Sequence, residues 1–211
     1  MPTRRLTMNI TGSVTVDIDE VEIIGSPPDE ATTWDPEDVY IGPGGEANFS
    51  NGNLTCSSTA SGDAGIRSNT SKNSGVRVAK FLLTYAGDPE DEAAGIGLAD
   101  PQVSVNDGYR YMLFTSGKIL GIGPPQELGG PVPSGEHGFV FLDEPAGKVW
   151  FDNEDGLYET DREAGTNPHF TFTPGDSFEL AGALVADSGT TSITLVDTAS
   201  FSSGRFGAWD A

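Results

Sequence analysis

Carboxylates are the residues of this chain whose type and spacing first suggest chemistry. Glycoside hydrolysis uses two carboxylates that flank the scissile bond, and one strand can present both from alternate positions. One dense group comprises Asp17, Asp19, Glu20 and Glu22. The segment 9–24 around that group contains no aromatic side chain that would stack against a sugar. A second group lies in a turn region, where acidic side chains are expected to be solvated; it comprises Asp152, Glu154, Asp155 and Glu159. The sequence therefore predicts no catalytic pair, and we expect a protein that is not an enzyme.

Metal ligation and nucleophilic catalysis are the next possibilities. The segment 152–156 has the composition of a calcium loop, but its glycine and its last acidic residue are not at the offsets of an EF-hand. A hairpin turn with a charged tip is the interpretation that we favour. His137 and His169 have no partner at ligand spacing, and Cys56 has no candidate base. The sequence predicts no metal site and no cofactor.

Tyrosine and arginine side chains remain as candidates for binding a partner, because these two residue types dominate interface hot spots. The candidates are Arg67, Tyr109, Arg110, Tyr111, Tyr158 and Arg162. Each of them also has a purely structural interpretation. Tyr109 and Tyr111 alternate with Met112 and Phe114 as residues of a core strand do, and Arg67 has the alternative of a salt bridge within the scaffold.

Short β-strands are the elements that must position these residues. The chain has 28 Gly and 14 Pro without a fixed period and no long apolar stripe of helical spacing, which is typical of strands joined by turns. The predicted strands span 47–49, 53–57, 76–85, 94–98, 109–114, 118–122, 138–143, 148–151, 170–173, 178–185 and 191–195. The interval 121–135, which contains Pro124 and Pro125, is predicted to be a long loop. The sequence therefore predicts an all-β chain.

Two stretches carry a resemblance to a known family. Gly147-Lys148-Val149-Trp150-Phe151 precedes an Asp-Gly turn and the segment Gly165-Thr166-Asn167-Pro168-His169-Phe170. Upstream, Trp34-Asp35-Pro36 leads into Ser50-Asn51-Gly52-Asn53-Leu54-Thr55, and Arg67 matches the arginine of a Val-Arg element. In this order the motifs resemble the SPRY-like (B30.2/SPRY, concanavalin-type) domain proteins encoded by tailed viruses of bacteria and archaea. The resemblance covers residues from about Thr32 to the end of the chain.

The resemblance implies a fold and a role. The implied fold is a two-sheet antiparallel β-sandwich of the SPRY/concanavalin-like jelly-roll type, preceded here by an N-terminal β arm. The implied role is a virion structural protein, such as a head decoration or turret, a fibre or a tail component. Its partners would be other virion proteins, further copies of the chain in a homo-oligomer, and a protein or glycan of the host surface. A lectin or glycan-active enzyme on the same sandwich, and a cytoplasmic adaptor, are the alternatives.

The charge balance limits the partners. Lys and Arg total 11 against 32 Asp and Glu, which gives a net charge of −21. Such a field repels nucleic acid and anionic membranes, so we expect neither as a partner. The acidity is either an ordinary soluble surface or an adaptation to high salt, where repulsion between carboxylates is screened. We favour the second interpretation, and with it a halophilic host, because the chain contains only four lysines.

Residues 1–30 fall outside the resemblance. Val14, Val16 and Ile18 alternate, and Val21 and Ile23 continue after a shift of one residue, which indicates a bulge or two short strands. The segment 25–30 is rich in Pro and acidic residues and is typical of a linker. We therefore divide the chain into an N-terminal β arm and linker, 1–30, and a SPRY-like β-sandwich domain, 31–211. No apolar run is long enough to span a membrane, so membrane insertion is not expected.

Overall fold

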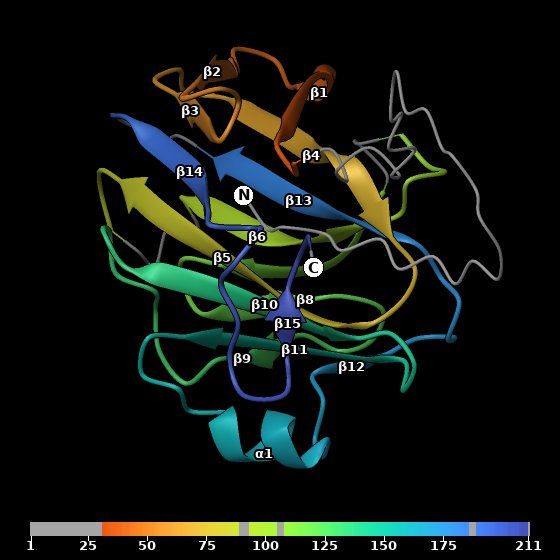
Figure 1. The fold of residues 1–211 in the computed structure, drawn as a ribbon. Helices are drawn as coiled ribbons and strands as arrows, with labels where there is room; N and C mark the ends of the chain where they lie inside the picture. Colours follow the sequence, from red (N-terminus) through yellow and green to blue (C-terminus); the bar gives the residue numbers. More distant parts are fainter. Residues whose placement is uncertain (1–30, 89–92, 105–107, 186–188, 211) are drawn as a thin grey trace, which may run out of the picture.

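The structure, a computed structural model, describes residues 31–88, 93–104, 108–185 and 189–210. Within these ranges the chain forms two β-sheets that pack face to face, with one short helix at the end of the molecule opposite β1 and β2 (Figure 1). The predicted arm and linker, residues 1–30, lie outside the described residues. The helical residues that the structure describes include no segment long and apolar enough to cross a membrane.

The strands are divided between the sheets as follows. The first sheet has the order β1 (Trp34–Ile41), β4 (Asp63–Lys72), β13 (Phe178–Val185), β6 (Ala94–Ala99), β7 (Tyr109–Phe114), β8 (Lys118–Leu120) and β9 (Gln126–Glu127). The second sheet has the order β12 (Phe170–Thr171), β11 (Lys148–Asn153), β10 (His137–Asp143), β5 (Val76–Tyr85), β14 (Thr191–Val196), β3 (Thr55–Ser58) and β2 (Asn48–Ser50). All these neighbours are antiparallel, and the short strand β15 (Gly207–Ala208) runs parallel to β5. The predicted all-β, two-sheet antiparallel sandwich is confirmed.

The core lies between the sheets because their strands alternate inward and outward side chains. In β5, for example, Ala79, Phe81 and Leu83 are buried in the main core, whereas Val78 belongs to a separate cluster on the outer face of the second sheet. The indole of Trp34 at the start of β1 stacks on Phe81 at 6.1 Å and donates a hydrogen bond of 3.3 Å to the carbonyl of Ile193. Strand β1, at the edge of the first sheet, is therefore tied to β5 and β14 of the second sheet.

Several elements were not predicted from the sequence. Strand β1 contains Pro36 and has an irregular register between Trp34 and Val39. Both features are typical of a strand at the edge of a sheet, where β1 lies. Strand β4 is built largely from small and polar residues, so it carries no alternating apolar pattern. The expectation of a long strandless loop over 121–135 was wrong, because Gln126–Glu127 pairs with β8. Strand β15, of two residues, also carries no pattern of its own.

The helix α1 (Glu159–Ala164) lies between the predicted strands 148–151 and 170–173, in a segment for which the sequence predicted no regular element. Six residues are too few to show a helical period. Its end is nevertheless clear, since Gly165 adopts a left-handed conformation with φ 68° and donates its N–H to the carbonyl of Arg162. Acidic Glu159 and Asp161 lie in its first turn, where they complement the helix dipole.

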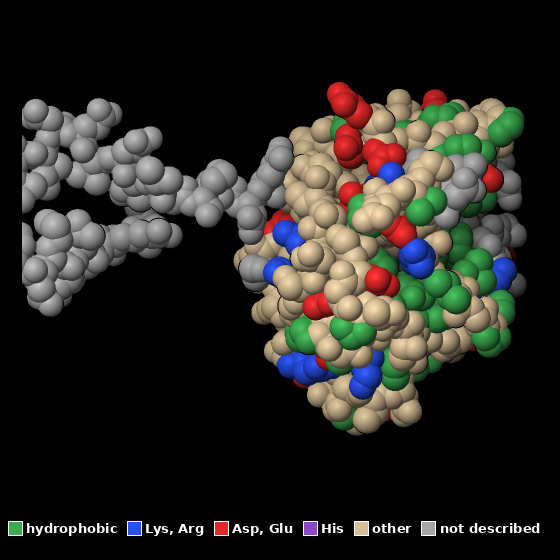
Figure 2. All heavy atoms as spheres, turned by 90° about the vertical axis from the view of Figure 1, so that its right-hand side faces the viewer, with side chains coloured by type: hydrophobic (Ala, Val, Ile, Leu, Met, Phe, Trp, Pro, Cys, Tyr) green, Lys and Arg blue, Asp and Glu red, His purple; other side chains and the backbone are tan. Residues whose placement is uncertain are grey.

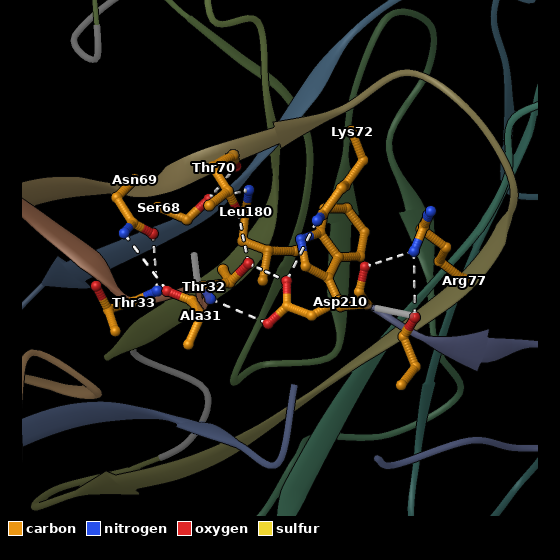
Figure 3. Close-up of polar contacts among 12 residues, drawn as sticks. Ala31, Thr32, Thr33, Ser68, Asn69, Thr70, Lys72, Arg77, Leu180 and Asp210 are labelled. Carbon is orange, nitrogen blue, oxygen red and sulfur yellow. Dashed lines mark hydrogen bonds and ion pairs between the residues drawn. The ribbon is translucent and has the colours of Figure 1, made fainter. Parts of the chain in front are cut away.

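The two ends of the described domain meet at a polar cluster that we call the clasp, made by Thr32, Lys72, Arg77 and Asp210 (Figure 3). The Asp210 carboxylate accepts hydrogen bonds from the backbone N–H of Thr32, at 3.0 Å, and from its hydroxyl, and lies 3.4 Å from the Lys72 ammonium. Arg77 donates to the carbonyl of Trp209 at 2.8 Å. Burial alone would raise the pKa of Asp210, but these hydrogen bonds, one from Thr198 and the charge of Lys72 together hold that pKa below its usual value.

Candidate functional site

On the outer face of the first sheet, large side chains lie flat over small residues. Its outward positions carry glycine and alanine in β6 and β13, and Tyr109, Met112 and Phe114 of β7 lie over them. A Cβ atom at Gly97 would lie 1.9 Å from the carbonyl oxygen of Tyr111 and 2.7 Å from the sulfur of Met112. The small residues therefore create the space that the side chains of β7 occupy.

An apolar hollow follows on this face between β7 and β8. It has a volume of about 320 Å³ and is lined by Tyr109, Arg110, Met112, Phe114, Leu120, Gly121 and Ile122. Ile122 is 66% exposed, which makes it the most exposed large apolar side chain among the described residues. An exposed apolar group that borders an apolar hollow is typical of a surface that another molecule covers.

A polar hollow, also of about 320 Å³, adjoins the apolar one at Arg110. Its lining comes from three loops and from the starts of β7 and β13, and comprises Asn73, Asp100, Pro101, Gln102, Arg110, Gly175, Asp176, Ser177 and Phe178. The Arg110 guanidinium donates to the carboxylate of Asp100, and 37% of the Arg110 side chain remains exposed. The backbone N–H of Gln102, together with Arg110, holds the pKa of Asp100 below its usual range. We call the two cavities the Arg110 hollows.

Arg67, predicted from the sequence as a partner-binding residue, lies beneath this surface. Its side chain is 6% exposed, forms ion pairs with Asp38 and Glu179, and donates to the carbonyls of Asp100 at 2.7 Å and Val103 at 2.8 Å. The structure therefore places Arg67 in the scaffold, the alternative that the sequence left open. Arg67 and Arg110 both hold the loop that starts at Asp100.

The two tyrosines of β7 divide between the faces of the sheet. Tyr109 lies on the outer face and donates its hydroxyl proton to the carbonyl of Gly182 at 3.0 Å, and burial raises its pKa. Tyr111 points into the main core, where it stacks on Phe170 at 4.8 Å. Of the candidates on this strand, Tyr109 and Arg110 line the apolar hollow and Tyr111 lies under it.

The other two candidates, Tyr158 and Arg162, lie near α1 at a distance from the Arg110 hollows. The Arg162 side chain is 7% exposed and forms an ion pair of 2.6 Å with Asp152, which is fully buried. The expectation that Asp152 is a solvated turn residue was therefore wrong. Burial raises the pKa of Asp152, against the opposing effects of the Asn153 N–H and the Arg162 charge. Tyr158 packs edge-on against the buried ring of His169 at 4.4 Å.

His169 and Cys56, two side chains that could support catalysis or metal binding, are buried within the fold. His169 accepts a hydrogen bond of 2.9 Å from the backbone of Phe151, and burial lowers its pKa to about 4. Burial raises the pKa of the Cys56 thiol to about 12, so the thiolate nucleophile is not favoured. Within residues 31–88, 93–104, 108–185 and 189–210, no three His, Cys, Asp or Glu side chains are placed to share a metal ion.

The surface around these sites carries charges of both signs. On the face drawn in Figure 2, acidic and basic side chains are interspersed, with apolar side chains between them. The sequence did not point to Met112, Phe114 and Ile122 as lining residues of a hollow, because apolar side chains in a strand region predict a core. Side chains alternate between the two faces of a strand, so Met112 and Phe114 lie on the opposite face from Tyr111. This alternation was the sequence signal that could have identified them.

The fold is of the SPRY type. The chain matches no family model and no curated protein. Among solved structures, it is similar to the SPRY domain of human HERC1, with a TM-score of 0.55 and 17% identity over 80% of this chain and 99% of that one. It is also similar to the TRIM65 PSpry domain, with a TM-score of 0.50 and 16% identity over 78% of this chain and 91% of that one. Stonustoxin matches with a TM-score of 0.51 and 16% identity over 78% of this chain and 27% of its own. These likenesses define a SPRY-like β-sandwich.

Proposed function

We propose that this chain is a non-enzymatic binding module that serves as a structural protein of a virus particle. It would dock on the particle as a head decoration or turret, a fibre or a tail component, and bind other proteins through the Arg110 hollows. The observation that carries the binding role is the arrangement of these hollows. An exposed arginine stands between an apolar cavity and a polar one, the combination that interface hot spots and their rims show.

Chemistry within the described residues favours binding over turnover. The groups that would act in catalysis, such as Arg67, Tyr109 and His169, are held by internal partners. The hollows are lined by apolar side chains, by the Arg110 guanidinium and by polar side chains such as Gln102 and Asp176. Such a surface would recognise a partner by burial of apolar area and by directed hydrogen bonds.

The virion role has its support in the sequence. Trp34-Asp35-Pro36, the Asn51-Gly52-Asn53 turn and Gly147-Lys148-Val149-Trp150-Phe151 stand in the order found in SPRY-like proteins of tailed viruses. The net charge of −21 disfavours nucleic acid and anionic membranes as partners. The proposed partners are therefore other virion proteins, further copies of this chain and the host surface, and the proposed location is the virion.

Particle composition tests the proposal. Virus particles purified on a density gradient from the source culture should contain the chain at a fixed ratio to the major capsid protein, as measured by quantitative mass spectrometry. In particles assembled with the variant Ile122→Asp, that ratio should fall at least about tenfold, because a charge in the apolar hollow opposes burial. Ile41→Asp, the same change at an exposed position on the opposite edge of the first sheet, is the matched control. Absence of the chain from purified particles refutes the virion role, and normal incorporation of Ile122→Asp refutes the use of the apolar hollow in docking.

A further inference from the structure

A second cavity lies on the opposite side of the sandwich, on the outer face of the second sheet. It has a volume of about 410 Å³, within the range of small-molecule sites. Phe139 and Phe141 of β10 and Phe201 of the segment after β14 form its apolar wall, and the turn between β11 and α1 forms its rim. We call it the phenylalanine pocket. It shares no residue with the Arg110 hollows.

The aromatic wall is continuous. Phe139 stacks on Phe201 with ring centroids 5.7 Å apart, and the ring of Phe141 lies 6.1 Å from that of Phe139. Phe139 and Phe201 are only partly buried, whereas Phe141 is fully buried at the base. Two rings therefore offer apolar surface to a ligand against a fixed base.

Cations of the chain itself already occupy positions beside these rings. The Lys80 ammonium lies 5.2 Å from the centroid of Phe201 and 5.9 Å from that of Phe139. The guanidinium carbon of Arg162 lies 4.2 Å from the centroid of Phe141. A cationic ligand would compete with both for the same aromatic surface and be repelled by them.

Hydrogen-bonding groups surround the opening. The carboxylates of Glu154 and Glu159 are 46% and 69% exposed, and the Ser203 hydroxyl also lines the pocket. These carboxylates, in a chain of net charge −21, oppose an anionic ligand. A wholly apolar ligand would cover them without replacing their hydrogen bonds to water, which is costly.

We propose that the phenylalanine pocket binds a neutral saccharide. A pyranose is uncharged, presents an apolar C–H face to the rings of Phe139 and Phe201, and carries hydroxyl donors for the carboxylates of Glu154 and Glu159. A pyranose therefore complements both the apolar wall and the acidic rim, and the neighbouring cations do not repel it. The assignment does not depend on the virion role, because it rests on the pocket alone.

Chemical-shift mapping on the purified full-length protein tests the proposal. The probes are the methyl α-pyranosides of glucose, mannose, galactose and N-acetylglucosamine, with L-arginine amide as a cationic probe and N-acetylneuraminic acid as an anionic one. At least one neutral glycoside should shift the backbone amide signals of residues 153–159 and 201–203 in a saturable way. The charged probes should shift them less at equal concentration.

Two variants assign the binding to the pocket. Phe201→Ala removes one of the two accessible rings and should weaken binding of the neutral glycoside about tenfold. Glu159→Gln, at a position 69% exposed whose ion pair with Arg162 is long at 3.9 Å, should weaken it several-fold. Ile41→Ala, at an exposed position of β1 in the opposite sheet, should leave it unchanged. The proposal is overturned if no neutral glycoside binds, if a charged probe binds more tightly at the same amides, or if Glu159→Gln and Phe201→Ala both bind like the unmodified protein. Particle incorporation is measured separately, so failure here leaves the proposed function standing.

Discussion

Replacement of Arg162 by methionine should strongly destabilise the fold, because it removes the counter-ion of a buried carboxylate. The guanidinium lies 2.6 Å from the carboxylate of Asp152, whose side chain is fully buried, and over the ring of Phe141. Methionine fills similar volume but leaves the carboxylate charged, buried and unpaired. Breaking a buried pair in this way costs about 3–5 kcal/mol. For a domain of this size the loss corresponds to a fall in Tm of about 6–20 °C.

Urea denaturation followed by tryptophan fluorescence measures this loss, because Trp34, Trp150 and Trp209 are all buried. Arg110→Met is the matched control: its ion pair with Asp100 is partly exposed, so the expected loss is at most about 1 kcal/mol. The double variant Asp152→Asn, Arg162→Met should recover part of the loss, since the unpaired charge is then gone.

The pH dependence gives a further check on the cause. Without Arg162, the pKa of Asp152 in the folded protein rises further above its value of about 3.9 in the unfolded chain. A carboxyl with a raised folded pKa favours the fold only when it is protonated, so the deficit of Arg162→Met should be largest near neutral pH and shrink on acidification. Equal losses for Arg162→Met and Arg110→Met, or a deficit that does not change with pH, would refute the reasoning.

Three further predictions follow from groups described above. Burial lowers the pKa of His169 to about 4, so the stability that its neutral ring contributes is complete above about pH 6.5 and is lost as the pH falls towards about 4. The urea midpoint of His169→Gln should therefore fall less than that of the unmodified protein between these two pH values. Equal falls in the two midpoints would contradict this prediction. Asp210→Asn should lose about 1.5–3 kcal/mol of stability at neutral pH, and less as the pH falls below about 3.9, whereas Asp197→Asn at an exposed turn should lose little. If the acidic surface is an adaptation to salt, the thermal midpoint should fall on desalting and recover on adding salt; an unchanged cooperative melt in low-salt buffer without divalent ions would sink that interpretation.

The predictable part of the fold is the part whose side chains alternate. The bounds of β5, β7 and β13 agree with those predicted, because apolar residues recur at every second position along β5 and β7, and along β13 with Gly182 as an interruption. Strand β4 escaped prediction although it pairs with both β1 and β13. Strand β4 contributes backbone hydrogen bonds and small residues such as Gly65, against which the Tyr109 ring packs. Neither contribution produces a hydrophobic periodicity in the sequence.

The candidate sites were predictable only in part, for a topological reason. Tyr109 and Arg110 lie at the hollows because their own strand positions them there. Asp152 could not be recognised as buried, because its partner Arg162 comes from a helix too short to show a pattern. The phenylalanine pocket depends on Phe201 meeting Phe139, which are brought together by the path of the chain after β14.

The clasp has a mechanical consequence. Because Thr32 and Asp210 are in contact, the chain enters and leaves the folded domain at neighbouring points (Figure 3). A tension applied between residues 31 and 210 would load the clasp before any strand pair, and would then peel β1 and the segment after β14 away from the sandwich. A domain whose two ends lie side by side can also be inserted into a loop of another protein with little distortion of that protein, because the ends of the insert occupy neighbouring positions.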